Sequence, residues 1–197
     1  MTGRLIVFEG IDKSGKETQA RLLTEFLRDQ RKTVATFSFP NYESWSGKQI
    51  KEWLHNKSIR NQYEVNMLYS LNRYEMKDTL EQCLKDYDYV ILDRYYHSNW
   101  IYGDFKEHVD QAWLRELDRA LPRPDIVILL CISGELSAER RGSMADIHEQ
   151  DIPFLNRCND KYHKIGIVNG WTMIDGDDLE EKIAWRIHTS FSPQLIT

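Results

Sequence analysis

Residues 5–18 read LIVFEGIDKSGKET, and this stretch decides the fold class. An apolar run from Leu5 to Phe8 precedes a loop with glycines at positions 10 and 15, and a helical pattern runs from Thr18 to Gln30. Two glycines with four residues between them, followed by Lys16, form a Walker A loop, in which inward-facing backbone N–H groups and a helix start bind phosphate. The alternative, an ordinary glycine turn, is disfavoured by the strand-loop-helix context. We therefore predict a phosphate-binding loop at residues 10–16.

The rest of the chain alternates between strand and helix patterns. Apolar runs rich in β-branched residues indicate buried parallel strands at 5–8, 90–92 and 126–132, with weaker candidates at 33–39 and 171–174. Helical patterns cover residues 18–30, 62–85, 110–120, 134–141, 153–165 and 178–189. We therefore predict an α/β fold, a doubly wound sheet of the P-loop NTPase type with five parallel strands flanked by helices. Ligands bind at the carboxyl edge of such sheets.

Length and composition predict a single globular unit. The chain has 197 residues, of which 41% are hydrophobic, and this excludes a disordered chain. We expect residues 1–197 to form one domain. Residues 141–152 are polar and lack periodicity between two helical patterns, so we predict a short lid there.

Charge and cysteine content exclude several classes of protein. The net charge is −5, which does not suit a nucleic-acid partner, because binding to the phosphate backbone needs an excess of Lys and Arg. Three widely spaced cysteines without a C-x-x-C pair predict neither a disulfide framework nor a zinc site. Apolar runs are too short to span a membrane, and the N-terminus lacks a signal-peptide pattern. We therefore expect no membrane partner and a cytoplasmic location.

Two positions bear on a metal ion. A Walker A loop usually continues with Ser or Thr, whose hydroxyl binds Mg²⁺, but position 17 is Glu17. Thr18 or a water replaces that hydroxyl, or Glu17 approaches the metal, or Glu17 only favours the helix start; the sequence leaves these open. Asp93 follows the run at 90–92, where an aspartate either binds Mg²⁺ or caps a turn. The adjacent Arg94 favours a phosphate site, because guanidinium groups bind phosphate through two hydrogen bonds.

Further motifs follow the loop in a recognisable order. They are Phe39-Pro40, Asn72-Arg73, Asp93-Arg94-Tyr95 with Ser98-Asn99 behind it, and LPRPD at residues 121–125. With the phosphate loop, they make the chain resemble the thymidylate kinase family from Leu5 to about Arg141. The resemblance implies ATP-dependent phosphorylation of a pyrimidine deoxynucleoside monophosphate, with dTMP converted to dTDP for dTTP synthesis, and Mg²⁺ as cofactor. It also implies a homodimer formed through helices that flank the sheet.

The resemblance implies a role for each matching residue. Asp12, Lys16 and Arg94 are the expected catalytic residues, with Arg94 bridging the phosphates of donor and acceptor. Asp93 and Asp12 are the expected metal ligands, directly or through water. Predicted ATP contacts are Gly10, Lys13, Ser14, Gly15, Lys16, Thr18, Arg140 and Arg141. Predicted contacts to the acceptor nucleotide are Asp12, Phe39, Tyr42, Tyr69, Arg73, Arg94, Asn99 and Tyr102.

The acceptor residues have distinct implied tasks, and each also has an ordinary structural explanation. Tyr69 is expected to stack on the base, Arg73 and Asn99 to bond its edge, and Tyr102 to lie under the sugar. Packing in the core, helix capping or a surface ion pair explains such residues singly, but not their joint placement after strands or on one helix face. Arg140 and Arg141 either contact phosphate or end a solvated helix.

This chain departs from the family pattern at two positions. Many members have Arg where this chain has Tyr42, and a phenol can bond a phosphate oxygen but supplies no charge. Lys13 resembles members that place a basic residue inside the phosphate loop instead of in the lid. Glu17 and Tyr42 keep open a non-catalytic nucleotide-binding homologue, which would bind ATP without turnover.

Other acceptors also stay open. The substrate is alternatively dUMP or another deoxynucleotide, because thymine differs from uracil by one methyl group, worth only about 1–3 kcal/mol. A deoxynucleoside is a further alternative. It would need a carboxylate base, and Glu9 at the end of the first strand is the candidate.

Overall fold

The computed structural model describes residues 3–56, 61–104, 108–140 and 151–195. The strands are β1 (Arg4–Glu9), β2 (Val34–Ser38), β3 (Tyr89–Asp93), β4 (Ile126–Cys131) and β5 (Thr172–Asp175). The helices are α1 (Lys16–Asp29), α2 (Trp45–Asn56), α3 (Gln62–Tyr74), α4 (Lys77–Asp86), α5 (Tyr96–Tyr102), α6 (Gln111–Leu117), α7 (Gly134–Arg140), α8 (Ile152–Asn169) and α9 (Glu180–Leu195). The predicted lid lies almost wholly outside the described residues, as does Arg141.

The strands form one parallel sheet in the order β2-β3-β1-β4-β5, so the predicted fold class is confirmed. β1 lies at its centre, between β3 and β4. Phe8 of β1 pairs with Asp93 of β3, and Glu9 pairs with Leu129 of β4. The residues that follow β1 and β3 therefore emerge side by side at the carboxyl edge of the sheet. This register brings the phosphate loop next to Asp93 and Arg94.

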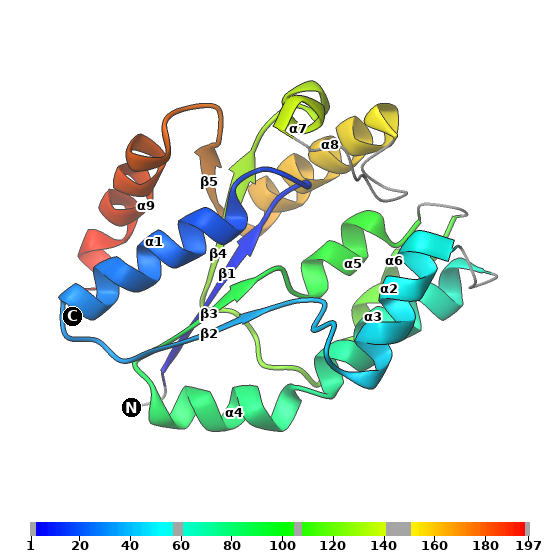
Figure 1. The fold of residues 1–197 in the computed structure, drawn as a ribbon, viewed down its shortest axis with the longest axis horizontal. Coiled ribbons are helices and arrows are strands. Elements are labelled where there is room, and N and C mark those ends of the chain that lie inside the picture. Colours follow the sequence, from blue (N-terminus) through cyan, green and yellow to red (C-terminus); the bar gives the residue numbers. More distant parts are fainter. Residues whose placement is uncertain (1–2, 57–60, 105–107, 141–150, 196–197) are drawn as a thin grey trace.

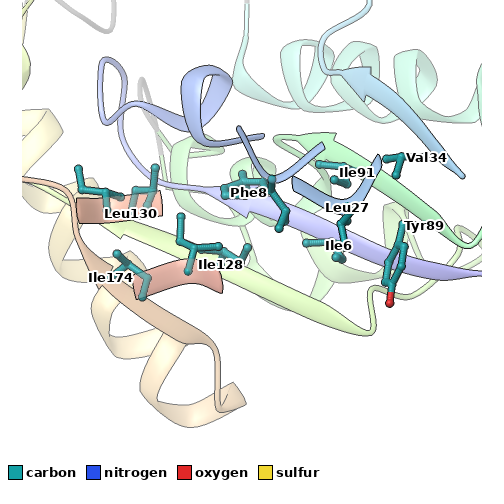
Figure 2. Close-up of a cluster of buried hydrophobic side chains, with 12 residues drawn as sticks. Ile6, Phe8, Leu27, Val34, Tyr89, Ile91, Ile128, Leu130 and Ile174 are labelled. Atoms are coloured by element: carbon teal, nitrogen blue, oxygen red, sulfur yellow. The ribbon is translucent and has the colours of Figure 1, made fainter. Parts of the chain in front are cut away.

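Alternate side chains along the strands point to opposite faces of the sheet, as the two-residue period of a strand requires. Helices α1 and α9 pack together on one face, over Ile6 of β1, Ile91 of β3 and Ile128 of β4 (Figure 1). Figure 2 shows this cluster, in which side chains from all five strands and α1 meet. The neighbouring residues Val7, Val90 and Leu129 pack instead on the other face, under α4, α5 and α8. Both faces of the sheet are thus buried, which explains the continuous apolar runs.

The centre of this core supplies a stability prediction. Ile128 is fully buried among the side chains of Figure 2, whereas Ile167 on α8 is 71% exposed. We expect Ile128→Ala to lower the free energy of unfolding by about 2–5 kcal/mol, because it removes buried methyl groups and leaves a cavity. The same change at Ile167 should cost less than about 0.5 kcal/mol. Urea unfolding monitored by circular dichroism compares the two, and equal losses would contradict this packing.

Three helical features differ from the sequence prediction. The pattern at residues 62–85 is not one long helix, because α3 ends at Tyr74 and α4 begins at Lys77. The helices α2 and α5 were not predicted, because each begins with aromatic or small residues that are poor helix formers. Packing stabilises α2, since Ile50 and Trp53 are buried against Val65 of α3. Within the described ranges, no helix combines the length and apolarity needed to cross a membrane.

Candidate active site

The phosphate loop connects β1 to α1 through backbone conformations that favour glycine. Gly10 and Gly15 have φ angles of 146° and 93°. A Cβ atom at Gly10 would lie 2.6 Å from the carbonyl oxygen of Leu130, so a larger residue would displace the loop. Gly15 is the N-cap of α1, and the loop thus ends at the positive pole of that helix dipole. The loop has the geometry of an anion site.

Lys16 is a buried cation at the start of α1. Its Nζ atom donates to the Ile11 carbonyl oxygen at 2.8 Å and to Ser14 Oγ at 3.3 Å, and both partners are neutral. Burial, together with the nearby charge of Arg94, lowers the pKa of Lys16 to about 8, although Asp93 and Asp12 oppose the shift. The fold therefore keeps an ammonium group where its charge is unfavourable until an anion arrives.

A first cavity of about 580 Å³ opens over the phosphate loop. Its walls include the loop, the first turn of α1, the end of β3 and the start of α9. Lining residues with predicted phosphate or metal roles are Asp12, Lys13, Ser14, Gly15, Lys16, Thr18, Asp93, Arg94 and Arg140. Arg140 also donates to the Gly176 carbonyl oxygen at 2.9 Å. The exposed Glu17 lines the same cavity.

A second, smaller cavity of about 90 Å³ lies between α3 and α5. Six of the predicted acceptor contacts line it together with Asp12: Tyr42, Tyr69, Arg73, Arg94, Asn99 and Tyr102. Tyr69 meets Trp53 edge to face, with ring centroids 6.4 Å apart. Asn99 Nδ2 donates to the Asn66 carbonyl oxygen at 3.2 Å. The cavity thus combines an aromatic ring with amide and guanidinium groups, as a flat polar ligand requires.

The two cavities meet at a pair of residues. Asp12 and Arg94 line both, and Arg94 Nη2 donates to Asp12 Oδ1. Tyr102 OH donates to the other carboxylate oxygen of Asp12 at 3.2 Å. Lys16 and Arg94 also line one shared cavity instead of opening onto separate surfaces. An anion bound at the loop and a ligand bound in the second cavity would therefore meet at Arg94.

Arg94 is held in a strained conformation by its surroundings. Its φ angle of 65° is unfavourable for a residue with a Cβ atom, at a cost on the order of 1–3 kcal/mol. Its N–H donates to the Phe8 carbonyl oxygen at 2.9 Å. Its Nη1 atom donates to the Gly10 carbonyl oxygen at 3.1 Å and to Ser98 Oγ at 3.2 Å. These contacts keep the guanidinium group between the two cavities.

Asp93 offers a carboxylate oxygen beside the phosphate loop. Its Oδ1 atom is buried and accepts no hydrogen bond within the described residues. Burial raises the pKa of Asp93, although Lys16 and Arg94 oppose the shift. A buried carboxylate oxygen without a hydrogen-bond partner is unfavourable, and a bound cation would satisfy it.

Glu9 is engaged in a different way. Its side chain is fully buried and lines neither cavity. The carboxylate accepts hydrogen bonds from Tyr95 N–H (2.9 Å), Ser98 Oγ (2.7 Å) and Tyr162 OH (2.8 Å). Burial opposes its ionisation, but hydrogen bonds and the neighbouring His97 and Arg94 lower the pKa of Glu9 overall. The group ties β1 to α5 and α8, a position that does not suit a base for a hydroxyl nucleophile.

Among the predicted contacts to the acceptor nucleotide, all of which lie in described residues, Phe39 is the one that does not line the second cavity. Its ring is 4% exposed and packs on Tyr95, with centroids 5.8 Å apart. Sequence reasoning missed Pro40, Leu54, Gln62, Val65, Asn66 and Ser98, which line that cavity. A signal for some of them was present, because Gln62, Asn66, Tyr69 and Arg73 follow the three- and four-residue spacing of one face of α3.

Comparisons with known proteins agree with this geometry. The thymidylate kinase family model matches residues 8–187. The chain is 34% identical over 185 residues to a thymidylate kinase of Arabidopsis thaliana, covering 94% of this chain and 69% of that protein. It is 29% identical to the Homo sapiens thymidylate kinase, over 92% of this chain and 86% of that one.

A solved structure of thymidylate kinase from Candida albicans superposes with a TM-score of 0.84 at 25% identity, covering 98% of this chain and 92% of that chain. The family match extends over nearly the whole sheet and both cavities. The chain belongs to the thymidylate kinase family.

Proposed function

We propose that this enzyme transfers the γ-phosphoryl group of ATP to dTMP and forms dTDP. The observation that carries the proposal is the junction of the two cavities at Asp12 and Arg94. Phosphoryl transfer needs donor and acceptor phosphates in line and close together, and it needs their charge neutralised. Family membership supports the same reaction.

The first cavity suits the ATP phosphates. Backbone N–H groups of the loop, from Gly10 to Lys16, and the Lys13 and Lys16 side chains would bind them. Ser14, Gly15 and Thr18 line the same wall, and Arg140 reaches it from α7. We keep all of these as ATP contacts.

The second cavity suits dTMP. Tyr69 would stack on the base, Arg73 and Asn99 would bond its edge, and Tyr102 would lie under the sugar. The exposed Tyr42 stands at the rim and would bond the acceptor phosphate. The contact from Phe39 stays a prediction, since its ring packs in the core and does not line this cavity. Arg94 would bridge the two phosphates from its place between the cavities.

The residues present fit a magnesium ion. Mg²⁺ prefers a few carboxylate oxygens, phosphates and waters, and Asp93 offers an unsatisfied oxygen in the ATP cavity. Asp93 and Asp12 would hold the ion, directly or through water. When bound, it neutralises charge on the ATP phosphates. Replacement of Asp93 by Asn should raise the Mg²⁺ concentration needed for half-maximal rate, and an unchanged requirement would contradict this role.

The acceptor needs no protein base. A phosphate monoester has a second pKa of about 6, so its attacking oxygen is already ionised at neutral pH. A nucleoside hydroxyl would need a base within reach, and Glu9 is held away from both cavities by its hydrogen bonds. The geometry thus favours a monophosphate over a nucleoside as acceptor.

We also propose a homodimer. Tyr63, Met67 and Leu71 of α3 are 40%, 47% and 41% exposed and recur every four residues, so they form an apolar stripe on one helix face. A second copy of the chain would cover it. Light scattering should give twice the mass of one chain, and the mass of a single chain would contradict the proposal. The single-domain organisation and the cytoplasmic location stay predictions.

A steady-state assay tests the proposed function. ADP release should be followed with ATP and Mg²⁺ and with dTMP, dUMP, dCMP, dGMP or thymidine as acceptor. We expect the highest kcat/KM with dTMP, no turnover of thymidine, and loss of activity when EDTA removes Mg²⁺. Preference for a purine would contradict the roles of Arg73 and Asn99, and turnover of thymidine alone would contradict the monophosphate reaction.

A further inference from the structure

A buried ion pair lies behind the base-binding cavity. Arg73 of α3 donates from Nε to Asp118 Oδ1 at 3.1 Å and from Nη2 to Asp118 Oδ2 at 2.7 Å. The two side chains are 3% and 1% exposed. Asp118 follows α6 directly and lies 45 residues further along the chain. Ser70, one turn before Arg73 on α3, also donates to Asp118 Oδ1, at 2.8 Å.

This pairing uses one side of the guanidinium group. A guanidinium has five N–H donors in a rigid fork, and the two-point contact with Asp118 fixes the plane of that fork. Arg73 also lines the second cavity, whereas Asp118 does not. In the ranges that the structure describes, Nη1 donates to no other group. The Nη1 donors are therefore left for a ligand in the cavity, at an orientation that Asp118 imposes.

We propose that Asp118 determines base specificity by holding Arg73 as a fixed donor against the edge of the pyrimidine, an inference that rests on the proposed function. An arginine only donates hydrogen bonds, so the atom opposite it must be an acceptor. Thymine and uracil carry an oxygen at position 4, whereas cytosine carries an amine that donates. A fixed guanidinium can therefore donate to thymine and to uracil. Against cytosine it would face another donor and stay unpaired, which strongly disfavours binding.

The burial of the pair supports a specificity role over a purely structural one. Apolar residues of similar volume often stabilise a core as well as a buried ion pair does, because desolvation of both charges offsets their attraction. A long arginine side chain without a partner would also sample many rotamers. Asp118 therefore adds orientation, and it acts through Arg73 as a positioning residue.

Asp118→Asn tests this directly. The amide keeps an acceptor oxygen for Ser70 and Arg73 Nε, but places an NH₂ group against Arg73 Nη2. We expect KM for dTMP to rise about tenfold with kcat within about twofold, and the ratio of kcat/KM for dTMP over dCMP to fall about tenfold. The matched control is Glu116→Gln on α6, because Glu116 forms an exposed pair with Arg119. That variant should keep wild-type constants.

If a thermal melt shows that Asp118→Asn is not folded, a milder variant tests the role of Asp118. Ser70→Ala removes one hydrogen bond to Asp118 and should raise KM for dTMP about twofold to threefold, again with kcat unchanged. A folded variant that keeps the full preference for dTMP over dCMP, or that loses kcat without a change in KM, would overturn the inference. Wild-type enzyme that fails to phosphorylate dTMP would instead overturn the proposed function, and this inference with it.

Discussion

Lys16→Ala is expected to lower kcat/KM for phosphoryl transfer at least about 10³-fold, equivalent to about 4 kcal/mol of transition-state stabilisation. The ammonium is buried at the phosphate loop, and among the described residues it donates only to the neutral Ile11 carbonyl and the Ser14 hydroxyl. Because Lys16 is only 6% exposed, its charge is screened less by solvent than that of a surface lysine when it acts on the phosphates. The measurement is steady-state turnover of ATP and dTMP at saturating Mg²⁺.

Stability provides the internal check on this variant. Burial lowers the pKa of Lys16 to about 8, so the folded protein disfavours the charged form relative to the unfolded chain at neutral pH. Removal of the ammonium should therefore leave Tm unchanged or raise it. Lys32→Ala, at an exposed position before β2, is the control and should retain activity. A large fall in Tm that accompanies the loss of activity would attribute that loss to unfolding and contradict the catalytic role.

Substitution of Arg94 should cause the second large loss of activity. Because it lines both cavities, Arg94→Lys should lower kcat about 10²-fold or more even though the charge is retained. The lysine cannot reproduce simultaneous contacts to Asp12, Gly10 and Ser98. Arg94→Ala should lose more, and KM should rise for both nucleotides because both phosphates would lose a donor.

The control for Arg94 is Arg21→Lys, since Arg21 is exposed and forms an ion pair with Glu25 on its own helix. Initial rates with each nucleotide varied in turn separate kcat from the two KM values. Near wild-type rates for Arg94→Lys would show that a positive charge at this position is sufficient for catalysis, and would contradict the need for the guanidinium contacts. A KM effect confined to one nucleotide would show that Arg94 serves only one cavity.

Strands and the phosphate loop were predictable because their signals are local. A buried parallel strand needs a continuous apolar run, and the runs at β1, β3 and β4 are of this kind. The edge strands β2 and β5 are only partly buried and gave weaker patterns, yet they too are present. The loop motif lies within one stretch of the chain, so its glycine and lysine spacing is visible without any long-range contact.

The end of α3 was not predictable, because no proline or glycine marks it. Met76 N–H donates to the Arg73 carbonyl oxygen, and the chain turns there before α4. The buried amide of Asn72 forms hydrogen bonds with the Asn41 main chain and with the Ser44 and Ser46 hydroxyls. Contacts with the loop after β2 therefore surround this turn, and they depend on residues about thirty positions away.

The sequence by itself determined the α/β architecture, the phosphate loop and the family, since each depends on residue type and spacing along short stretches. Only the tertiary structure decided that the two cavities share Asp12 and Arg94, that Phe39 belongs to the core, and that Glu9 is held by α5 and α8. The pairing of Arg73 with Asp118 is likewise a tertiary feature. The physical reason is distance along the chain: parallel strands place their ends side by side, and contacts between those ends leave no periodic pattern.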